Sequence, residues 1–257
     1  MHKDLFTIEG KTALVTGGSR GIGFMIARAY VEAGAKVYIS SRKADICAEA
    51  EASLSKLGTC TALPADLSKM DEIDRLANEL KAREDALHVL VNNAGASWGA
   101  KVDDFPEQGW DKVMDVNLKA PFFLIQKLLP ALEAAARADD PARIINIGSV
   151  DGLHNSIFEN FSYGPSKAGL HHMTRNLAAH LAARHITVNA VAPGPFATDM
   201  MKPMIETMGD AITANVPLKR MGSQDDAGGI AIFLAARASA YITGAVIPLD
   251  GGVIAAS

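Results

Sequence analysis

The sequence has few cysteines, no strong excess of charge and no metal-ligand motif, and each shortage excludes a class of protein. Among its 257 residues the only cysteines are Cys47 and Cys60, whose spacing does not suit a metal site. We expect reduced packing residues, no disulfide and no bound metal. The net charge is −4 and there is no basic tract, so nucleic acids and anionic membranes are not expected as partners.

Long apolar segments are missing as well. The sequence has no run of about 18 apolar residues, the length a membrane-spanning helix needs. Its first ten residues, MHKDLFTIEG, contain no apolar core of the kind found in signal peptides. We therefore expect a cytoplasmic protein. A hydrophobic fraction of 49% and a charged fraction of 21% are typical of a folded globular chain.

Short β-branched apolar runs alternate with segments of helical periodicity. The expected strands are Thr12–Thr16, Lys36–Ser40, Cys60–Pro64, His88–Asn92, Arg143–Ile147, Thr187–Ala192 and Ala245–Leu249. The expected helices are Ile22–Ala33, Asp45–Leu57, Met70–Arg83, Gln108–Ala136, Tyr163–Arg184 and Gln224–Ala236. This alternation predicts an α/β fold, a single Rossmann-like doubly wound domain over residues 1–257 with a seven-stranded parallel sheet and helices on both faces. A methionine-rich insertion at about residues 194–221 interrupts the alternation, and we expect a lid there.

A glycine-rich segment, TGGSRGIG at residues 16–23, directly follows the first expected strand and leads into a helix. Glycines allow the backbone to turn tightly and to approach a pyrophosphate at the helix N-terminus, where free N–H groups favour anions. The gap between Gly17 and Gly21 is longer than in the common GxGxxG pattern. The segment predicts a dinucleotide site.

The second expected strand ends without the carboxylate that an NAD site presents to the ribose hydroxyls. Arg42 follows that strand instead, and Arg20 lies in the glycine-rich segment. Both can pair with a 2′-phosphate through charge-assisted hydrogen bonds. We therefore expect NADP(H) rather than NAD; the alternative is that both arginines are ordinary surface charges.

The segment YGPSK sets the phenol of Tyr163 and the ammonium group of Lys167 four residues apart, on one face of a helix. A positive charge nearby lowers the pKa of a tyrosine from its usual value of about 10. We expect Lys167 to make Tyr163 a better acid in this way. Such pairs also arise by chance, so the pair gains its weight from the other motifs.

Several motifs together resemble the short-chain dehydrogenase/reductase family over essentially the whole chain. They are TGGSRGIG from Thr16, Asp66-Leu67, NNAG from Asn92, Asn117, Ser149, YGPSK from Tyr163 and PGPFAT from Pro193. The segments NNAGASWGA, GWDKVM and PARIINIGSV further resemble the NADPH-dependent β-ketoacyl reductase branch associated with rhamnolipids.

The resemblance implies an enzyme that reduces a ketone to a secondary alcohol, the ketone being a 3-oxoacyl thioester or a related hydrophobic carbonyl. Two alternatives stay open, a dehydrogenase of a sugar, polyol or steroid alcohol, and a regulator that senses NADP without turnover. An enoyl reductase would have a longer gap between its tyrosine and lysine.

The same resemblance assigns roles to individual residues. Tyr163 donates a proton to the developing alkoxide, and Ser149 hydrogen-bonds the carbonyl oxygen. Lys167 holds the nicotinamide ribose, and Asn117 anchors a water that connects Lys167 to solvent. The residues expected to bind the cofactor are Gly17, Ser19, Arg20, Gly21, Ile22, Gly23, Arg42, Asp66, Leu67, Asn93, Ala94, Gly95, Tyr163, Lys167, Pro193, Gly194, Phe196 and Thr198. Asn92 is expected to stabilise the central strand. The alternative role for Ser149 is a strand-end cap, and the alternative for Asn117 is a buried polar group in a helix.

Substrate and assembly are expected from the remaining polar and apolar residues near these motifs. The predicted substrate contacts are Ser149, Tyr163, Trp98, His154, Phe158 and Met200, since methionines and aromatics suit an aliphatic or cyclic ketone. An acyl carrier protein is a candidate partner, with Lys202, Lys219 and Arg220 as candidate contacts. His171, His172 and His180 are expected on the helix surface or at a subunit contact, and the resemblance implies a homotetramer paired through the helices of Asn117 and Tyr163.

Overall fold

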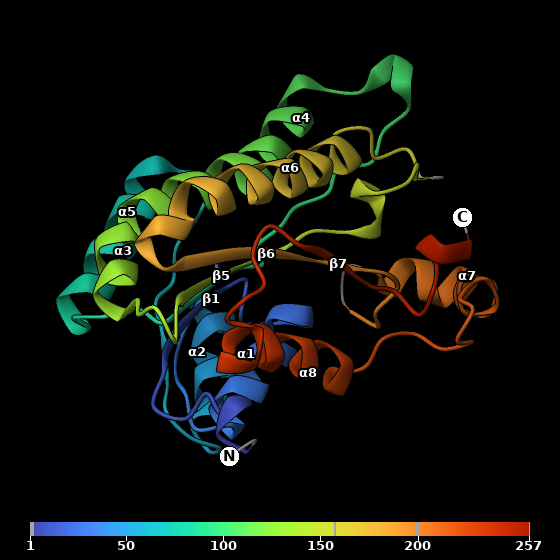
Figure 1. Cartoon of the computed structure of the whole chain (residues 1–257). Helices are drawn as coiled ribbons and strands as arrows, with labels where there is room; N and C mark the ends of the chain where they lie inside the picture. The colour runs from blue at the N-terminus through green and yellow to red at the C-terminus, as the bar shows by residue number, and fades with distance from the viewer. Residues whose placement is uncertain (1–2, 157, 199–200, 257) are drawn as a thin grey trace.

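The computed structural model describes residues 3–156, 158–198 and 201–256, which form a sheet covered by helices on both faces (Figure 1). The sheet has seven parallel strands in the order β3-β2-β1-β4-β5-β6-β7. The strands are β1 (Thr12–Thr16), β2 (Lys36–Ser40), β3 (Cys60–Ala62), β4 (Val89–Asn92), β5 (Ala142–Ile147), β6 (Ile186–Pro193) and β7 (Val246–Leu249). The predicted seven-stranded parallel sheet is confirmed.

Eight α-helices are seen in the described part of the chain. They are α1 (Gly21–Glu32), α2 (Ala44–Leu54), α3 (Met70–Arg83), α4 (Glu107–Met114), α5 (Ala120–Ala135), α6 (Tyr163–Leu181), α7 (Lys202–Asn215) and α8 (Gln224–Ala235). In Figure 1, α1, α2 and α8 lie on one side of the sheet and α3, α5 and α6 on the other. None of the helices among the described residues is long and apolar enough to cross a membrane.

Strand β1 shows why the sheet has a core on each face. Side chains of successive strand residues point to opposite sides. Ala13 and Val15 belong to the apolar cluster that includes α1, α2 and α8, and Leu14 belongs to the cluster that includes α3 and α5. All five residues of β1 are buried. A strand covered on both faces reads as a continuous apolar run rather than an alternating one, as this sequence does.

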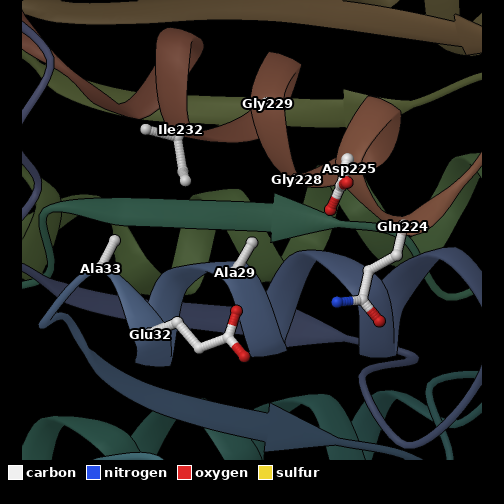
Figure 2. Close-up of a pocket in the computed structure, with 8 residues that line it drawn as sticks. All are labelled: Ala29, Glu32, Ala33, Gln224, Asp225, Gly228, Gly229 and Ile232. Atoms are coloured by element: carbon white, nitrogen blue, oxygen red, sulfur yellow. The ribbon is translucent and has the colours of Figure 1, made fainter.

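Helices α1 and α8 pack together along a seam of small residues. A Cβ atom on Gly228 would lie 2.7 Å from the Cβ atom of Ala29, so the glycine permits the close approach of the two helices. Figure 2 shows the pocket at this seam, lined by Ala29, Glu32, Ala33, Gln224, Asp225, Gly228, Gly229 and Ile232. None of these residues is predicted to bind the cofactor or the substrate.

Two segments differ from the sequence-based expectation. The helix expected at Gln108–Ala136 contains a π-helical turn at Asp115–Lys119 between α4 and α5, and the insertion at about residues 194–221 contains α7. Helix α7 is hard to predict from the sequence because it is kinked. Met208 has non-helical backbone angles (φ −138°, ψ 15°), so the residues before and after it do not share one continuous apolar face. The other boundaries agree with the prediction to within three residues.

Candidate active site

The predicted site residues gather where β1, β4, β5 and β6 end. The strand order reverses between β1 and β4, and open α/β sheets bind ligands at such a reversal, beyond the carboxyl ends of the strands. Thr16 joins the two ends: its hydroxyl donates to Val91 O (3.2 Å) and accepts the backbone N–H groups of Asn93 (2.9 Å) and Ala94 (3.1 Å). The Asn93 amide donates to Thr16 O (2.9 Å), so Asn93 holds the glycine loop in place.

The glycine loop leaves no room for side chains. A Cβ atom on Gly23 would lie 2.3 Å from the carbonyl oxygen of Gly17, and one on Gly17 would lie 2.7 Å from the Asn93 amide nitrogen. Gly17 also has a φ of +65°, which favours glycine. The loop leads directly into α1, whose first turn has no side-chain cap. Its N–H groups are therefore available to an anion such as a pyrophosphate.

The end of β2 has the features expected of a 2′-phosphate site. Arg42 is exposed directly beyond the strand, and Arg20 is the N-cap residue of α1. The Ser40 hydroxyl is buried and has no hydrogen-bond partner in the described part of the chain. The strand offers no carboxylate at this point, so the local charge suits a phosphate rather than a ribose hydroxyl pair.

Other predicted cofactor contacts come together around the loop. A Cβ atom on Gly21 would lie 3.4 Å from Thr198 Cγ2, and one on Gly95 would lie 3.5 Å from Asn117 Oδ1 and 3.7 Å from Lys167 Nζ. These contacts bring residues that follow β1, β4 and β6 next to the helix of the YGPSK motif. The remaining predicted contacts at or just after strand ends are Ser19, Ile22, Ala94, Pro193 and Gly194.

Three predicted cofactor residues are engaged elsewhere through their side chains. Leu67 and Phe196 are buried in the two apolar clusters, and the Phe196 ring packs where a Cβ atom of Gly222 would be. The Asp66 carboxylate accepts the backbone N–H (3.2 Å) and hydroxyl (2.8 Å) of Ser68. Leu67 and Phe196 can therefore meet a ligand only through their backbone.

Ser149 and Tyr163 meet above the end of β5. Ser149 is 8% exposed, and its Oγ accepts the Asp151 N–H (3.1 Å), which caps a 3₁₀ turn at Val150–Gly152. Tyr163 begins α6, and its side chain is hydrogen-bonded to that of Ser149. Lys167 lies one turn later with its Nζ 5.7 Å from the centre of the Tyr163 ring, donating to Ile147 O at 2.8 Å.

The expectation that Lys167 lowers the pKa of Tyr163 is wrong for this structure. Burial raises the pKa of the phenol to about 12; the hydrogen bond with Ser149 opposes this rise, and the charge of Asp151 adds to it. Burial also lowers the pKa of Lys167 to about 8. Removal from water therefore governs both groups, since it penalises the charged form of each.

Asn117 lies in the π-helical turn and is fixed by three hydrogen bonds. Its Oδ1 accepts the Ala96 N–H (2.8 Å), and its Nδ2 donates to Ala96 O (2.9 Å) and to Ser166 Oγ (2.9 Å). The Ser166 hydroxyl in turn donates to Tyr163 O (2.6 Å). Ser166 thus connects Asn117 to the first turn of α6. Sequence reasoning missed this residue, although its place inside YGPSK was a signal. Single π-helical turns often lie at functional sites.

The predicted substrate residues differ in their exposure and contacts. His154 Nε2 is 3.7 Å from Asp151 Oδ1, and Phe158 is exposed. The Trp98 ring packs on Gly109 of α4, 5.4 Å below the Lys112 ammonium group, so one of its faces is covered by protein. Met200 lies outside the described residues.

The histidines of α6 and the basic residues near α7 agree only in part with the expected positions. His171 is 2% exposed, so its expected place on the helix surface is wrong, whereas His172 and His180 are exposed. Arg220 forms an ion pair with Asp226. Lys219 donates to Ala214 O (2.6 Å), so two of the three residues considered for a carrier-protein contact have partners within the chain. The side chain of the third, Lys202, is not among those that the structure describes.

Asn92 has the structural role expected of it. Its buried Nδ2 donates to Asn146 Oδ1 of the neighbouring strand (2.9 Å), and Asn146 Nδ2 donates to Thr174 Oγ1 of α6 (2.9 Å). This chain of hydrogen bonds ties β4, β5 and the YGPSK helix together. Among the described residues there is no group of three or more histidine, cysteine or acidic side chains that could hold a metal ion.

Comparison with known proteins places this geometry in a family. Residues 17–254 match the family model described as Enoyl-(Acyl carrier protein) reductase. The rhamnolipids biosynthesis 3-oxoacyl-[acyl-carrier-protein] reductase of Pseudomonas aeruginosa is 47% identical over 249 residues, which cover 96% of this chain and 97% of that protein. The chain belongs to the short-chain dehydrogenase/reductase family. Its fold and motifs are those predicted from the sequence.

A solved structure and a second relative are also informative. A solved structure described as the Pseudomonas aeruginosa RhlG/NADP active-site complex superposes with a TM-score of 0.95 at 47% identity, covering 99% of this chain and 100% of that chain. The 2-dehydro-3-deoxy-D-gluconate 5-dehydrogenase of Bacillus subtilis is 38% identical over 252 residues, 97% of this chain and 96% of that protein. The Pseudomonas aeruginosa reductase is named for an acyl thioester, and the Bacillus subtilis dehydrogenase is named for a sugar acid.

Proposed function

We propose that this chain is an NADPH-dependent reductase of a 3-oxoacyl thioester or a related hydrophobic ketone. The observation that carries the proposal is the meeting of Ser149, Tyr163 and Lys167 at the carboxyl edge of the sheet, beside a glycine loop suited to a dinucleotide. The similarity to a 3-oxoacyl-[acyl-carrier-protein] reductase over 96% of the chain supports this substrate class.

The residues present fit NADPH, which supplies a hydride when bound. Gly17 and Gly23 keep the loop backbone bare, and the uncapped first turn of α1 offers N–H groups to the pyrophosphate. Arg42, with Arg20, would hold the 2′-phosphate. The solved NADP complex of a relative at 47% identity supports the same cofactor.

Ser149 and Tyr163 would both hydrogen-bond the carbonyl oxygen of the ketone and stabilise the negative charge that develops there. With its pKa raised to about 12, the Tyr163 phenol is protonated at neutral pH and can donate its proton to that oxygen. The protonated phenol is the form that the reduction uses. Lys167, one turn later in α6, would hold the nicotinamide ribose, the role that the family resemblance gives it.

Asn117 and Ser166 would hold Tyr163 and Lys167 in position. The Asn117 amide is held between the loop after β4 and the first turn of α6. Its position next to Lys167, seen in their shared approach to Gly95, supports a role in returning a proton to Lys167 through water.

We also propose an assembly and a location. A mainly apolar groove between α5 and α6, lined by Leu118, Phe122, Phe123 and Met173 among others, supports pairing of these helices in a homotetramer.

Free, buried cysteines support a reducing, cytoplasmic location. A single sheet carrying both the glycine loop and the catalytic residues supports one domain over residues 1–257. An acyl carrier protein stays a candidate partner.

The proposal is tested by following NADPH and NADH consumption with a panel of ketones. We expect 3-oxoacyl thioesters and their simple ester analogues to be reduced with NADPH, and NADH to be a poor substitute. The second candidate function, oxidation of a sugar-type alcohol with NADP, is supported by the similarity to the Bacillus subtilis dehydrogenase. A chain that oxidises sugar acids but reduces no 3-oxo ester would favour that function.

A further inference from the structure

A carboxylate lies beside the proposed reaction centre, and the mechanism above does not use it. Asp151 is two residues after Ser149, in the 3₁₀ turn Val150–Gly152. Its N–H group donates to Ser149 Oγ (3.1 Å), which fixes the residue to the proposed catalytic serine. Its side chain is only 19% exposed, so its charge is poorly screened by water.

The contacts of the Asp151 carboxylate come from the loop that leads to Tyr163. His154 Nε2 is 3.7 Å from its Oδ1. Burial raises the pKa of this carboxyl, and His154, Ser156 and Asn160 oppose the rise. From α6, its charge acts on the Tyr163 hydroxyl and raises the pKa of that group. Gly164 also packs here, since a Cβ atom on it would lie 3.0 Å from Asp151 O. The carboxylate therefore lies within electrostatic reach of the hydroxyl that would meet the substrate.

Two other titratable groups lie near this turn, Lys167 and His171, and each has contacts of its own. Lys167 is buried behind the Tyr163 ring, with its Nζ on Ile147 O. His171 packs beneath the turn against Gly148 and Gly152, and burial holds its pKa at about 4, so it is neutral near pH 7. Among the described residues, the His154 ring is the basic group in contact with the Asp151 carboxylate.

We propose that Asp151 is a specificity-determining residue that disfavours ketones carrying an anionic group close to the reacting carbonyl. The inference rests on the proposed function, because it concerns which ketones reach Ser149 and Tyr163. A 3-oxoacyl thioester is uncharged next to its ketone and avoids the repulsion. A free 3-oxo acid or a keto sugar acid carries a carboxylate a few bonds from the reacting carbon.

The size of the effect follows from the repulsion between like charges. At a separation of about 8 Å and an effective dielectric constant of about 20, two unit charges disfavour each other roughly thirtyfold. Asp151 thus offers a physical distinction between the two kinds of substrate named for the relatives, an acyl thioester and a sugar acid.

The test uses two ketones that differ in one charge, ethyl 3-oxohexanoate and 3-oxohexanoate, each assayed with NADPH. We expect the wild-type protein to prefer the ester, and Asp151→Asn to raise kcat/KM for the acid roughly thirtyfold relative to the ester. Asp151→Glu, which keeps the charge, should keep the preference. Asp139→Asn is the matched control, because Asp139 is exposed in the loop before β5, and this variant should not change the ratio.

A second readout separates an electrostatic role from a structural one. Neutralising Asp151 removes a charge that raises the pKa of Tyr163, so the alkaline limb of kcat/KM for the ester should move to lower pH in Asp151→Asn. If Asp151→Asn does not fold, Asp151→Ser provides the same comparison. An unchanged ester-to-acid ratio in a folded neutral variant would overturn the inference. Failure of the wild-type protein to reduce the ester would instead overturn the proposed function.

Discussion

Replacing His171 with a side chain that does not titrate should make the protein less sensitive to acid. His171 lies in α6 with both ring nitrogens buried and without hydrogen-bond partners in the described part of the chain. Its ring fills the space beside Gly148 and Gly152, where added Cβ atoms would lie 2.0 Å from Nε2 and 2.8 Å from Cε1. Burial lowers its pKa from 6.5 to about 4; the Gly152 backbone opposes this shift, and the charges of Lys167 and Arg175 add smaller contributions to it.

The sign and size of the effect follow from linkage between proton binding and folding. The folded-state pKa of about 4 is below the unfolded value of about 6.5, so the unfolded chain binds the proton more tightly. The free energy of unfolding should therefore fall as the pH drops below about 6.5 and level off below about 4, with a total loss of about 3 kcal/mol from this group. Above pH 7 this contribution is fully present.

The assay is urea denaturation of the wild-type protein, His171→Gln and the control His180→Gln at several pH values from 7.5 to about 4. His180 is the matched control because it lies on the same helix and is exposed. We expect the difference in unfolding free energy between the wild-type protein and His171→Gln to change by about 3 kcal/mol across this range, in favour of the variant at low pH. Parallel pH dependences for the two proteins would refute the reasoning.

Two further changes probe the cofactor and catalytic groups. Arg42→Ala should raise KM for NADPH about tenfold or more, the size of one lost charge-assisted hydrogen bond, and leave KM for NADH nearly unchanged. An equal rise in KM for both cofactors would contradict the role of Arg42 at the 2′-phosphate. Ser166→Ala removes the hydroxyl between Asn117 and Tyr163. It should lower kcat about tenfold and leave the NADPH affinity in a binding titration unchanged. An unchanged kcat would show that the hydrogen bonds to Ala96 are enough to hold Asn117.

Much of the fold was predictable because both faces of the sheet are covered. A buried strand such as β1 must be apolar at every position, and glycine and polar residues then mark its end. The strand ends in turn define where the site lies, since parallel strands deliver their carboxyl ends to one edge. For this reason the sequence alone locates Gly17, Ser149 and Asn93 at this edge.

What the sequence could not predict depends on burial and on local irregularity. The pKa values of Tyr163 and Lys167 are governed by removal from water rather than by their four-residue spacing, and spacing does not report burial. The histidines of α6 look alike in sequence, yet His171 faces the loop of Ser149 while its neighbour His172 is exposed. The π-helical turn at Asn117 inserts into an otherwise regular periodicity and leaves no signal in composition.

The most direct test of the account is Tyr163→Phe, which removes the hydroxyl proposed to donate the proton and keeps the aromatic ring. Reduction of ethyl 3-oxohexanoate with NADPH and binding of NADPH by fluorescence titration are measured on the same preparation. We predict that turnover falls at least a thousandfold, on the order of the contribution of a positioned general acid together with a hydrogen bond to the developing charge, while the Kd for NADPH changes little. Turnover comparable to that of the wild-type protein would contradict the central claim that Tyr163 is the proton donor.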